Sequence, residues 1–215
     1  MPAVDVTHSR PEHGKRETLK RLLAVSRREF AAKGLAGARV DVIAQQAGVT
    51  KQLVYHYFGS KEALFANVLD ESSFDVMSEL LALNIDDLQP PDAILFFLDA
   101  IFTRYKTDKC LGSLAQEGIR YHENHSTPAN KFIGMAPALV AKLDLVLKRG
   151  ARRGDFQPGI DARLFLATAA LITSGGFTNR YSVSSIVGFC TTSEEGMAAW
   201  HRHAADFIMA AIRAR

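Results

Sequence analysis

Apolar residues recur at intervals of three and four positions along most of the chain, which is the pattern of amphipathic α-helices. The first run begins at Lys15 and ends near Gly34, a residue that accepts the left-handed backbone of a helix end. Its apolar face is predicted to hold Leu19, Leu22, Leu23, Ser26 and Phe30. Two short helices are predicted at 40–47 and 50–58, and a long fourth helix begins at Ser60.

The rest of the chain keeps the same helical period between breaks that contain proline and glycine. The predicted helices of this part are 91–107, 110–123, 128–153, 161–181 and 193–213. No useful length of sequence alternates apolar with polar residues, as a half-buried strand would. The pattern therefore predicts an all-α protein of about nine helices, with an N-terminal three-helix head on a larger C-terminal helical bundle.

Charge divides the chain at the same place as the predicted architecture. The 215 residues carry a net charge of +3, but residues 1–61 hold 11 Lys and Arg against five Asp and Glu. The remaining 154 residues hold 15 basic and 18 acidic side chains. A basic head favours an anionic partner, and a solvated basic surface without a partner is the alternative.

Pattern and charge together predict three segments. Residues 1–14 contain two prolines, a glycine and few apolar positions, so they are predicted to form a flexible arm. Residues 15–60 are expected to form the head, and residues 61–215 the body.

Residues 40–58 have the composition of two short helices that cross at a tight turn. Small side chains at Ala44 and Ala47 allow a close crossing, and Gly48 tolerates the positive φ that the turn needs. The outward side of the second helix then carries Lys51, Gln52, Leu53, Tyr55, His56 and Tyr57. In the major groove, Gln binds adenine and Lys binds guanine, while Tyr and Lys also reach phosphates. The pattern indicates a helix-turn-helix, and a helical hairpin within an ordinary bundle is the alternative.

The sequence from Ile43 to Leu64, IAQQAGVTKQLVYHYFGSKEAL, resembles the DNA-binding signature of the TetR family of bacterial transcriptional regulators. That signature reads roughly I-A-x-x-A-G-V-S-x-x-x-[LIV]-Y-x-[HY]-F-x-[SN]-K-x-x-L, and nearly every fixed position matches. The chain departs from the family before the second helix, where Ala38, Arg39 and Val40 replace the usual Thr or Ser.

The resemblance implies a homodimer of DNA-binding heads on helical bodies that dimerise and bind a small-molecule effector. It assigns the base contacts to Lys51, Gln52 and Leu53. It assigns phosphate contacts to Thr50, Tyr55, Tyr57 and Lys61, and Arg39 is a candidate to replace the phosphate contact of the absent hydroxyl. Lys61 also begins the fourth helix, where free backbone N–H groups attract a phosphate. For Tyr55 and Tyr57, packing in the core is the alternative.

Polar residues on otherwise apolar helices mark a candidate effector pocket in the body. The set is Phe97, Arg104, Glu117, Arg120, Tyr121, His122 and Phe177. It combines apolar walls with a few polar groups, as small-molecule sites do. The alternative is that Glu117 and Arg120 form an i, i+3 surface pair and that the Phe residues belong to the core.

The last two predicted helices, at 161–181 and 193–213, correspond to the usual dimer interface of the family. Their candidate interface residues are Phe165, Leu171, Trp200, Ala204, Phe207 and Ile208. Each of these could equally belong to the core of one chain. Gly175 and Gly176 lie inside the first helix at a cost of roughly 1 kcal/mol each. That cost indicates a close approach at the dimer interface or a kink beside a ligand.

Other classes of function have little support in the sequence. No apolar stretch reaches the roughly 18 residues of a membrane-spanning helix, and the polar N-terminus is unlike a secretory signal. We therefore expect no membrane partner and a cytoplasmic location. Cys110 and Cys190 are too few for a zinc finger or a disulfide framework. No catalytic, metal-ligating or cofactor motif is legible, so we expect no enzyme activity, no bound metal and no cofactor.

The leading hypothesis is a transcriptional repressor that binds a palindromic double-stranded DNA operator as a homodimer and responds to an unknown small-molecule effector. The second hypothesis is a DNA-binding protein of the same fold whose body binds another protein. A large cavity in the body favours the first hypothesis, whereas a filled body with an exposed apolar patch favours the second.

Overall fold

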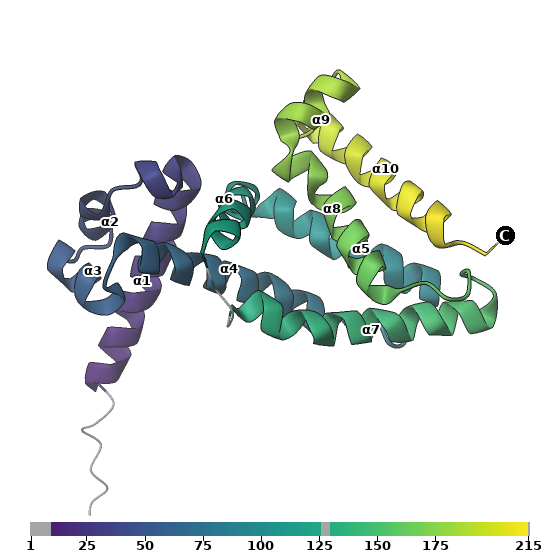
Figure 1. The fold of residues 1–215 in the computed structure, drawn as a ribbon, viewed down its shortest axis with the longest axis horizontal. Coiled ribbons are helices and arrows are strands. Elements are labelled where there is room, and N and C mark those ends of the chain that lie inside the picture. The colour runs from purple at the N-terminus through teal and green to yellow at the C-terminus, as the bar shows by residue number, and fades with distance from the viewer. Residues whose placement is uncertain (1–9, 126–129, 215) are drawn as a thin grey trace, which may run out of the picture. The chain divides into compact units, whose positions relative to one another are not determined.

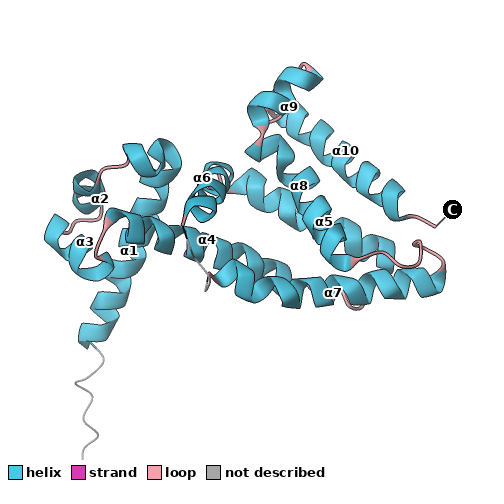
Figure 2. Ribbon diagram, viewed as in Figure 1, coloured by secondary structure: helices cyan, strands magenta, loops and turns pink. Residues whose placement is uncertain are grey.

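The computed structural model describes residues 10–125 and 130–214, which fold into ten α-helices and no β-strand (Figures 1 and 2). The helices are α1 (Arg10–Gly37), α2 (Val40–Gln46), α3 (Lys51–Phe58), α4 (Lys61–Ala82), α5 (Pro90–Thr107), α6 (Leu111–Asn124), α7 (Lys131–Arg153), α8 (Ala162–Thr178), α9 (Arg180–Val187) and α10 (Glu194–Ile212). The all-α prediction is confirmed for these residues. The tenth helix arises because the range expected at 161–181 divides at Asn179, whose φ of −114° and ψ of 29° are not helical.

The chain forms two compact units, a head that extends to Glu71 and a body that begins at Ser72. The boundary expected at residue 60 therefore lies later, within α4. The reason is that the first half of α4 contributes to the head core. Leu64 and Phe65 are fully buried, and the ring of Phe65 meets that of Phe30 edge-on at 4.9 Å between centroids.

The first helix begins earlier than the sequence pattern predicts. Residues 1–9 of the expected arm lie outside the described residues, but α1 already begins at Arg10. Pro11 lies in the first turn of α1, where proline is tolerated because the first N–H groups of a helix have no partner within it. The predicted end of this helix is confirmed by a break at Gly34, whose φ is 65°.

Side-chain caps begin the later helices of the head. Oγ1 of Thr50 accepts a hydrogen bond from the backbone N–H of Leu53 at 3.2 Å, so Thr50 is the N-cap of α3. Oγ of Ser60 accepts from the N–H of Ala63 at 3.0 Å in the same way. Between α2 and α3, Gly48 has the positive φ of 64° that the turn needs. The buried apolar core of the head includes Leu22, Val25, Phe30, Ile43, Ala44, Ala47, Val54, Leu64 and Phe65.

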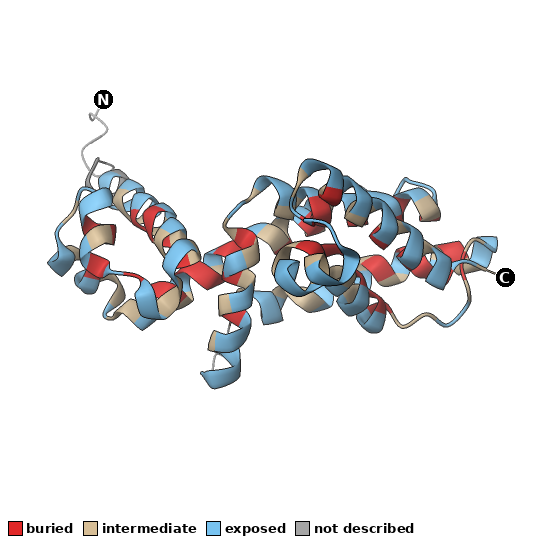
Figure 3. Cartoon of the chain, turned by 90° about the horizontal axis from the view of Figure 1, so that it is seen from above, coloured by how far each residue is buried: buried red, intermediate tan, exposed pale blue. Residues whose placement is uncertain are grey.

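In the body, α8 packs against α5, α7 and α10 around one apolar core. Figure 3 shows the buried positions of the chain in red. The C-terminal end of α4 is held by α7, because Nζ of Lys142 donates to the carbonyl oxygen of Leu81 at 2.6 Å. The loop that follows is held by Arg149, which donates to the carbonyls of Ile85 and Leu88 at 3.2 and 2.7 Å. A cation beside free carbonyls also suits the negative end of the helix dipole.

Candidate functional site

Helix α3 buries one side chain and exposes most of the others. Val54 is only 1% exposed and fixes α3 to the head core. The exposed residues of α3 are Lys51, Gln52, Tyr55 and His56. The predicted base-contacting residues Lys51, Gln52 and Leu53 occupy the first turn of α3, and Leu53 is partly buried. This is the part of a recognition helix that meets base edges in a major groove.

Two hydrogen bonds fix the start of α3 and the end of α2. Nε of Arg21 donates to the carbonyl oxygen of Ala47 at 2.7 Å, just after the last residue of α2. The hydroxyl of Thr50, a predicted phosphate contact, accepts from the N–H of Leu53. A hydroxyl that accepts one hydrogen bond keeps its own proton to donate. Capping and phosphate binding by Thr50 are therefore compatible.

Arg39 is exposed, but its charge is already paired within the head. Its guanidinium donates to the two carboxylate oxygens of Asp41 at 2.6 and 3.2 Å. These hydrogen bonds raise the pKa of Arg39 and lower the pKa of the Asp41 carboxyl. Arg39 is also the N-cap residue of α2 and makes no side-chain capping bond, as expected where the family's Thr or Ser is absent. A phosphate at this position would compete with Asp41 for the guanidinium.

Lys61 lies at the start of α4 and is partly buried. Its Nζ donates to the carbonyl oxygens of Ala36 at 3.4 Å and Ala38 at 3.3 Å, which follow the helix break in α1. An ammonium group has three N–H donors. Two of the three are therefore used within the head, and one remains for an external acceptor.

Tyr55 and Tyr57 lie in the C-terminal half of α3, and neither is a core residue. Tyr55 is 40% exposed and Tyr57 is partly exposed. Nζ of Lys51 lies 6.0 Å from the centroid of the Tyr55 ring, and Nζ of Lys15 lies 5.9 Å from that of Tyr57. Both tyrosines thus have a cation over the ring face. Lys15 belongs to α1 and lies beside Tyr57 because the helices of the head pack together. In the sequence, Lys15 was marked only by the excess of basic residues in the head.

The residues predicted for the effector pocket have several different environments in the body. Phe97 is fully buried in the main core, as its alternative interpretation held. Arg104 forms ion pairs with Glu79 at 2.8 Å and with Asp108 at 3.2 Å. Phe177 lines a cavity.

The four predicted pocket residues on α6 lie partly or fully at the surface. Glu117 and Arg120 form an i, i+3 ion pair at 2.7 Å, which is the alternative interpretation of these two residues. The ring of Tyr121 stacks on that of His125 with centroids 4.2 Å apart, and His122 is exposed. Of the residues predicted for the pocket, Phe177 lines the cavity that is described next.

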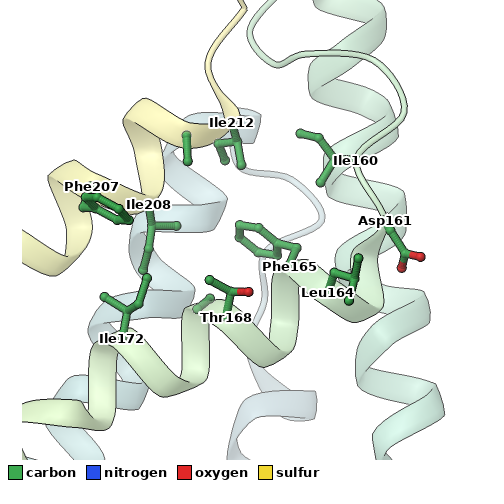
Figure 4. Close-up of a pocket in the computed structure, with 11 residues that line it drawn as sticks. Ile160, Asp161, Leu164, Phe165, Thr168, Ile172, Phe207, Ile208 and Ile212 are labelled. Atoms are coloured by element: carbon green, nitrogen blue, oxygen red, sulfur yellow. The ribbon is translucent and has the colours of Figure 1, made fainter.

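Three cavities of the body differ in their chemistry. The cavity that we call the α6 cavity has a volume of about 370 Å³. It is lined by Tyr105, Lys106, Asp108, Lys109, Gly112, Ser113, Gln116, Phe177, Arg180, Thr192 and Met197. The α7–α8 groove, of about 730 Å³, and the α8–α10 groove, of about 240 Å³, have mainly aliphatic and aromatic walls. Figure 4 shows the α8–α10 groove, into which Phe165, Ile172 and Ile208 project from the two helices.

The predicted interface residues divide into buried and exposed groups. Those buried within their own chain are Phe165, Ala204 and Ile208. They belong to the core because α8 and α10 pack on each other, which was the alternative interpretation. Leu171 is 70% exposed and Phe207 is 57% exposed, so for these two the interface role stays a prediction. Leu164, two helical turns before Leu171, is 69% exposed and was not among the predicted interface residues.

Trp200 is also engaged within its own chain. Its Nε1 donates to the carbonyl oxygen of Ile172 at 3.1 Å. A Cβ placed on Gly176 would lie 2.8 Å from Cδ1 of Trp200, and one on Gly175 would lie 3.4 Å from Cζ2. Gly176 therefore admits the indole to the surface of α8, while the distance at Gly175 is an ordinary contact. The predicted kink is wrong, because α8 continues as a helix through both residues. Both glycines are buried in their own chain, where Trp200 accounts for the close approach to Gly176.

Comparison with known proteins agrees with this geometry over both units. Residues 22–68 match the family model of bacterial regulatory proteins of the tetR family. Residues 90–208, more than half of the chain, match the tetracyclin repressor-like C-terminal domain. The chain belongs to the TetR family. It is a DNA-binding transcriptional regulator, and α3 is the second helix of its helix-turn-helix.

Individual relatives of this TetR-family chain are bacterial regulators. It is 35% identical to the HTH-type transcriptional repressor SCO4008 of Streptomyces coelicolor over 105 residues. This aligned region covers 48% of this chain and 51% of that protein. It is 25% identical over 203 residues to the HTH-type transcriptional repressor NicS of Pseudomonas putida, across 91% and 92% of the two chains. The solved structure of the regulator FadR from Bacillus subtilis in complex with stearoyl-CoA shares the fold, with a TM-score of 0.64 and 18% identity over 91% of this chain and all of that one.

Other kinds of site were also sought in this TetR-family chain. Over residues 10–125 and 130–214, no three or more His, Cys, Asp and Glu side chains gather as they would around a metal ion. No helix of these same ranges is long and apolar enough to cross a membrane. Cys190 is exposed, and its hydrogen bond with the Thr192 hydroxyl lowers the pKa of the thiol, with a smaller contribution from the charge of Arg180. The sequence spacing gave no sign of that contact.

Proposed function

We propose that this TetR-family regulator is a repressor that binds a palindromic operator as a homodimer and changes its DNA affinity when a small molecule binds the body. The observation that carries the proposal is the exposed first turn of α3. A short helix that is fixed by one buried residue and presents Lys51 and Gln52 outward has the form of a major-groove reader.

The base contacts are proposed for Lys51, Gln52 and Leu53. Gln can pair with the N6 and N7 edge of adenine, and Lys can donate to the O6 and N7 edge of guanine. Leu53 can pack on a thymine methyl group. Because Thr50 caps α3, the backbone that carries these three side chains is set before DNA arrives.

The phosphate contacts are proposed for Thr50, Tyr55, Tyr57, Lys61 and Arg39. Thr50 has a free hydroxyl proton, and Lys61 has a third ammonium donor beyond the two that bind carbonyls. The hydroxyl groups of the two tyrosines lie on residues that are not buried. Arg39 should contribute least, because Asp41 already neutralises it. Such contacts position the head without reading sequence.

Dimerisation is proposed to use the outer face of α8 and α10. Leu164 and Leu171 on α8 and Phe207 on α10 are more than half exposed. Leu164 and Phe207 also line the α8–α10 groove (Figure 4). A two-fold axis places the same face of a second copy against this one, so each groove can receive side chains from the other copy. A palindromic site requires two identical heads in this arrangement.

The effector is proposed to bind in the body. The α6 cavity and the α7–α8 groove both have volumes in the range that small ligands use. FadR of Bacillus subtilis, which shares this fold, was solved with stearoyl-CoA. A ligand changes DNA affinity only to the extent that it binds one arrangement of the heads more tightly than another.

Selection of bound sequences from random double-stranded DNA tests the proposal with the full chain. We expect the selected sequences to share two inverted half-sites about one helical turn apart, near 34–36 Å. Sedimentation at micromolar concentration should show a dimer. A monomer that binds a palindrome tightly, or selected sequences without inverted symmetry, would contradict the proposal.

A further inference from the structure

The α6 cavity is the most polar of the three body cavities and has the most positive lining. Lys106 and Lys109 come from the end of α5 and the turn after it, and Arg180 begins α9. The one carboxylate in the lining, Asp108, is bound to Arg104 at 3.2 Å. Three cations thus surround a space of about 370 Å³ with one carboxylate that is already neutralised.

These three cations have no counter-charge in the described part of the chain. Within residues 10–125 and 130–214, Lys106, Lys109 and Arg180 form no ion pair with an acidic side chain. Like charges that converge on one space repel one another, and an anion in that space relieves the repulsion. The lining therefore favours a negatively charged occupant.

Two aromatic residues, Tyr105 and Phe177, line the same cavity. The ring of Phe177 is nearly parallel to that of Tyr105, with centroids 5.7 Å apart and planes inclined by 24°. The ring of Phe177 also meets that of Phe102, with centroids 5.2 Å apart. Burial raises the pKa of the Tyr105 hydroxyl, so this ring stays neutral. Met197 of α10 adds a further apolar group to the lining.

The first turn of α6 forms another part of the wall. Gly112 and Ser113 line the cavity, and a Cβ on Gly112 would lie 3.4 Å from the carbonyl oxygen of Phe177. The first turn of α6 thus packs at ordinary contact distance on the backbone of Phe177. Cys110 precedes α6 without a side-chain cap, so N–H groups of this first turn add partial positive charge to the same side.

We propose that the α6 cavity binds a small aromatic carboxylate, with its ring on Phe177 and its charge among Lys106, Lys109 and Arg180. The inference rests on the proposed function, because it names the chemical class of the effector. The two other grooves do not fit this class. Their acidic residues are Asp161, which is bound by Arg163 at 2.6 Å, and Asp144 of the α7–α8 groove, which is bound by Lys148 at 2.7 Å. Their remaining walls are mainly apolar.

The test compares acids with their neutral amides on the full-length protein. Benzoate and 2-naphthoate are the probes, and benzamide and 2-naphthamide are the matched neutral compounds. Calorimetric titration should show each acid binding at least about ten-fold more tightly than its amide, because charge-assisted hydrogen bonds form only with the acid. Benzoate should also change the emission of Trp200, the one tryptophan of the chain, which packs beside Gly176 one residue before Phe177.

Two double variants with equal loss of charge locate the site. Lys109→Gln with Arg180→Gln should remove the preference for acid over amide. Lys148→Gln with Arg202→Gln, at exposed positions outside the lining, should keep it. All four substitutions are at exposed residues, so both variants should fold, and melting curves check this.

Equal affinity for acid and amide, no binding of either acid up to its solubility, or a preference that survives in the Lys109 and Arg180 variant would overturn the proposal. Operator affinity of the same samples separates this outcome from failure of the proposed function. If the protein binds its operator but neither acid, only the proposed chemical class of the effector is wrong. If the acids bind at this cavity but operator affinity does not change, the cavity is a binding site for aromatic acids and these acids are not effectors.

Discussion

The head and the body expose opposite kinds of side chain. On α3 of the head, the exposed residues are polar, with Lys51 and Gln52 in the first turn. On α8 and α10 of the body, the exposed residues include Leu164, Leu171 and Phe207. Polar donors remain hydrated until an acceptor such as a base edge replaces the water, whereas apolar groups gather where another protein surface covers them. The contrast agrees with DNA binding by the head and with the proposed contact of the body with a second copy.

Glycine also has different roles in the two units. Gly48 in the head has a positive φ, and a Cβ there would meet no atom within 4 Å. Its role is the backbone conformation of the turn. Gly176 in the body lies within a regular helix, and a Cβ there would collide with Trp200. Its role is the close approach of another helix.

The largest effect should come from charging the exposed apolar face of the body. Leu171→Asp combined with Phe207→Asp places carboxylates where two copies are proposed to meet, so the variant should sediment as a monomer. Operator affinity should fall by about 10²–10⁴-fold, because the second head no longer binds as part of the same molecule. Leu145→Asp, at a 64% exposed position on α7, should change neither property. If the double variant stays dimeric, the dimer interface lies elsewhere on the body.

The next effect concerns the first turn of α3. Gln52→Ala and Lys51→Ala should each reduce discrimination between operator and scrambled DNA by about 1–3 kcal/mol if the contacts are bidentate. His56→Ala, which alters an exposed residue of the same helix without an assigned contact, is the matched control. Fluorescence anisotropy with both DNA sequences measures the difference. If both variants discriminate between the two DNA sequences as well as the wild type does, Lys51 and Gln52 do not read bases.

A stability measurement examines the contrast between the glycines. Gly176→Ala should destabilise the protein by about 1–3 kcal/mol, because the new methyl group overpacks against Trp200. Gly134→Ala, in α7 with no atom within 4 Å of the new Cβ, should instead be neutral or stabilise by up to about 1 kcal/mol. Urea unfolding of the two variants gives both values. If the two substitutions change the free energy of unfolding equally, helix propensity alone accounts for both changes.

The smallest effect is expected for Lys61. Lys61→Ala should weaken binding to operator and scrambled DNA alike and reduce the salt slope of binding by about one unit per head. Titrations at several salt concentrations measure the slope. If the slope stays unchanged while stability falls, Lys61 acts only through the carbonyls of Ala36 and Ala38.

The arrangement of the head was predictable because neighbouring residues determine it. Thr50 caps the helix that it precedes, and Gly48 turns the chain next to it. In the body, the same kind of reasoning could not distinguish Phe97 in the core from Phe177 beside a cavity. Both are aromatic residues on amphipathic helices, and only the packing of other helices separates them.

By itself, the sequence determined the all-α fold, the helix-turn-helix, and the outward side chains of α3, because helical period, caps and turns act over a few residues. Tertiary structure decided that Phe165 and Ile208 are core residues while Leu171 is exposed. It also brought Lys106, Lys109 and Arg180 around one cavity from two distant parts of the chain. Burial and the convergence of charge depend on which helices meet, and that depends on the packing of the whole body rather than on any local run of residues.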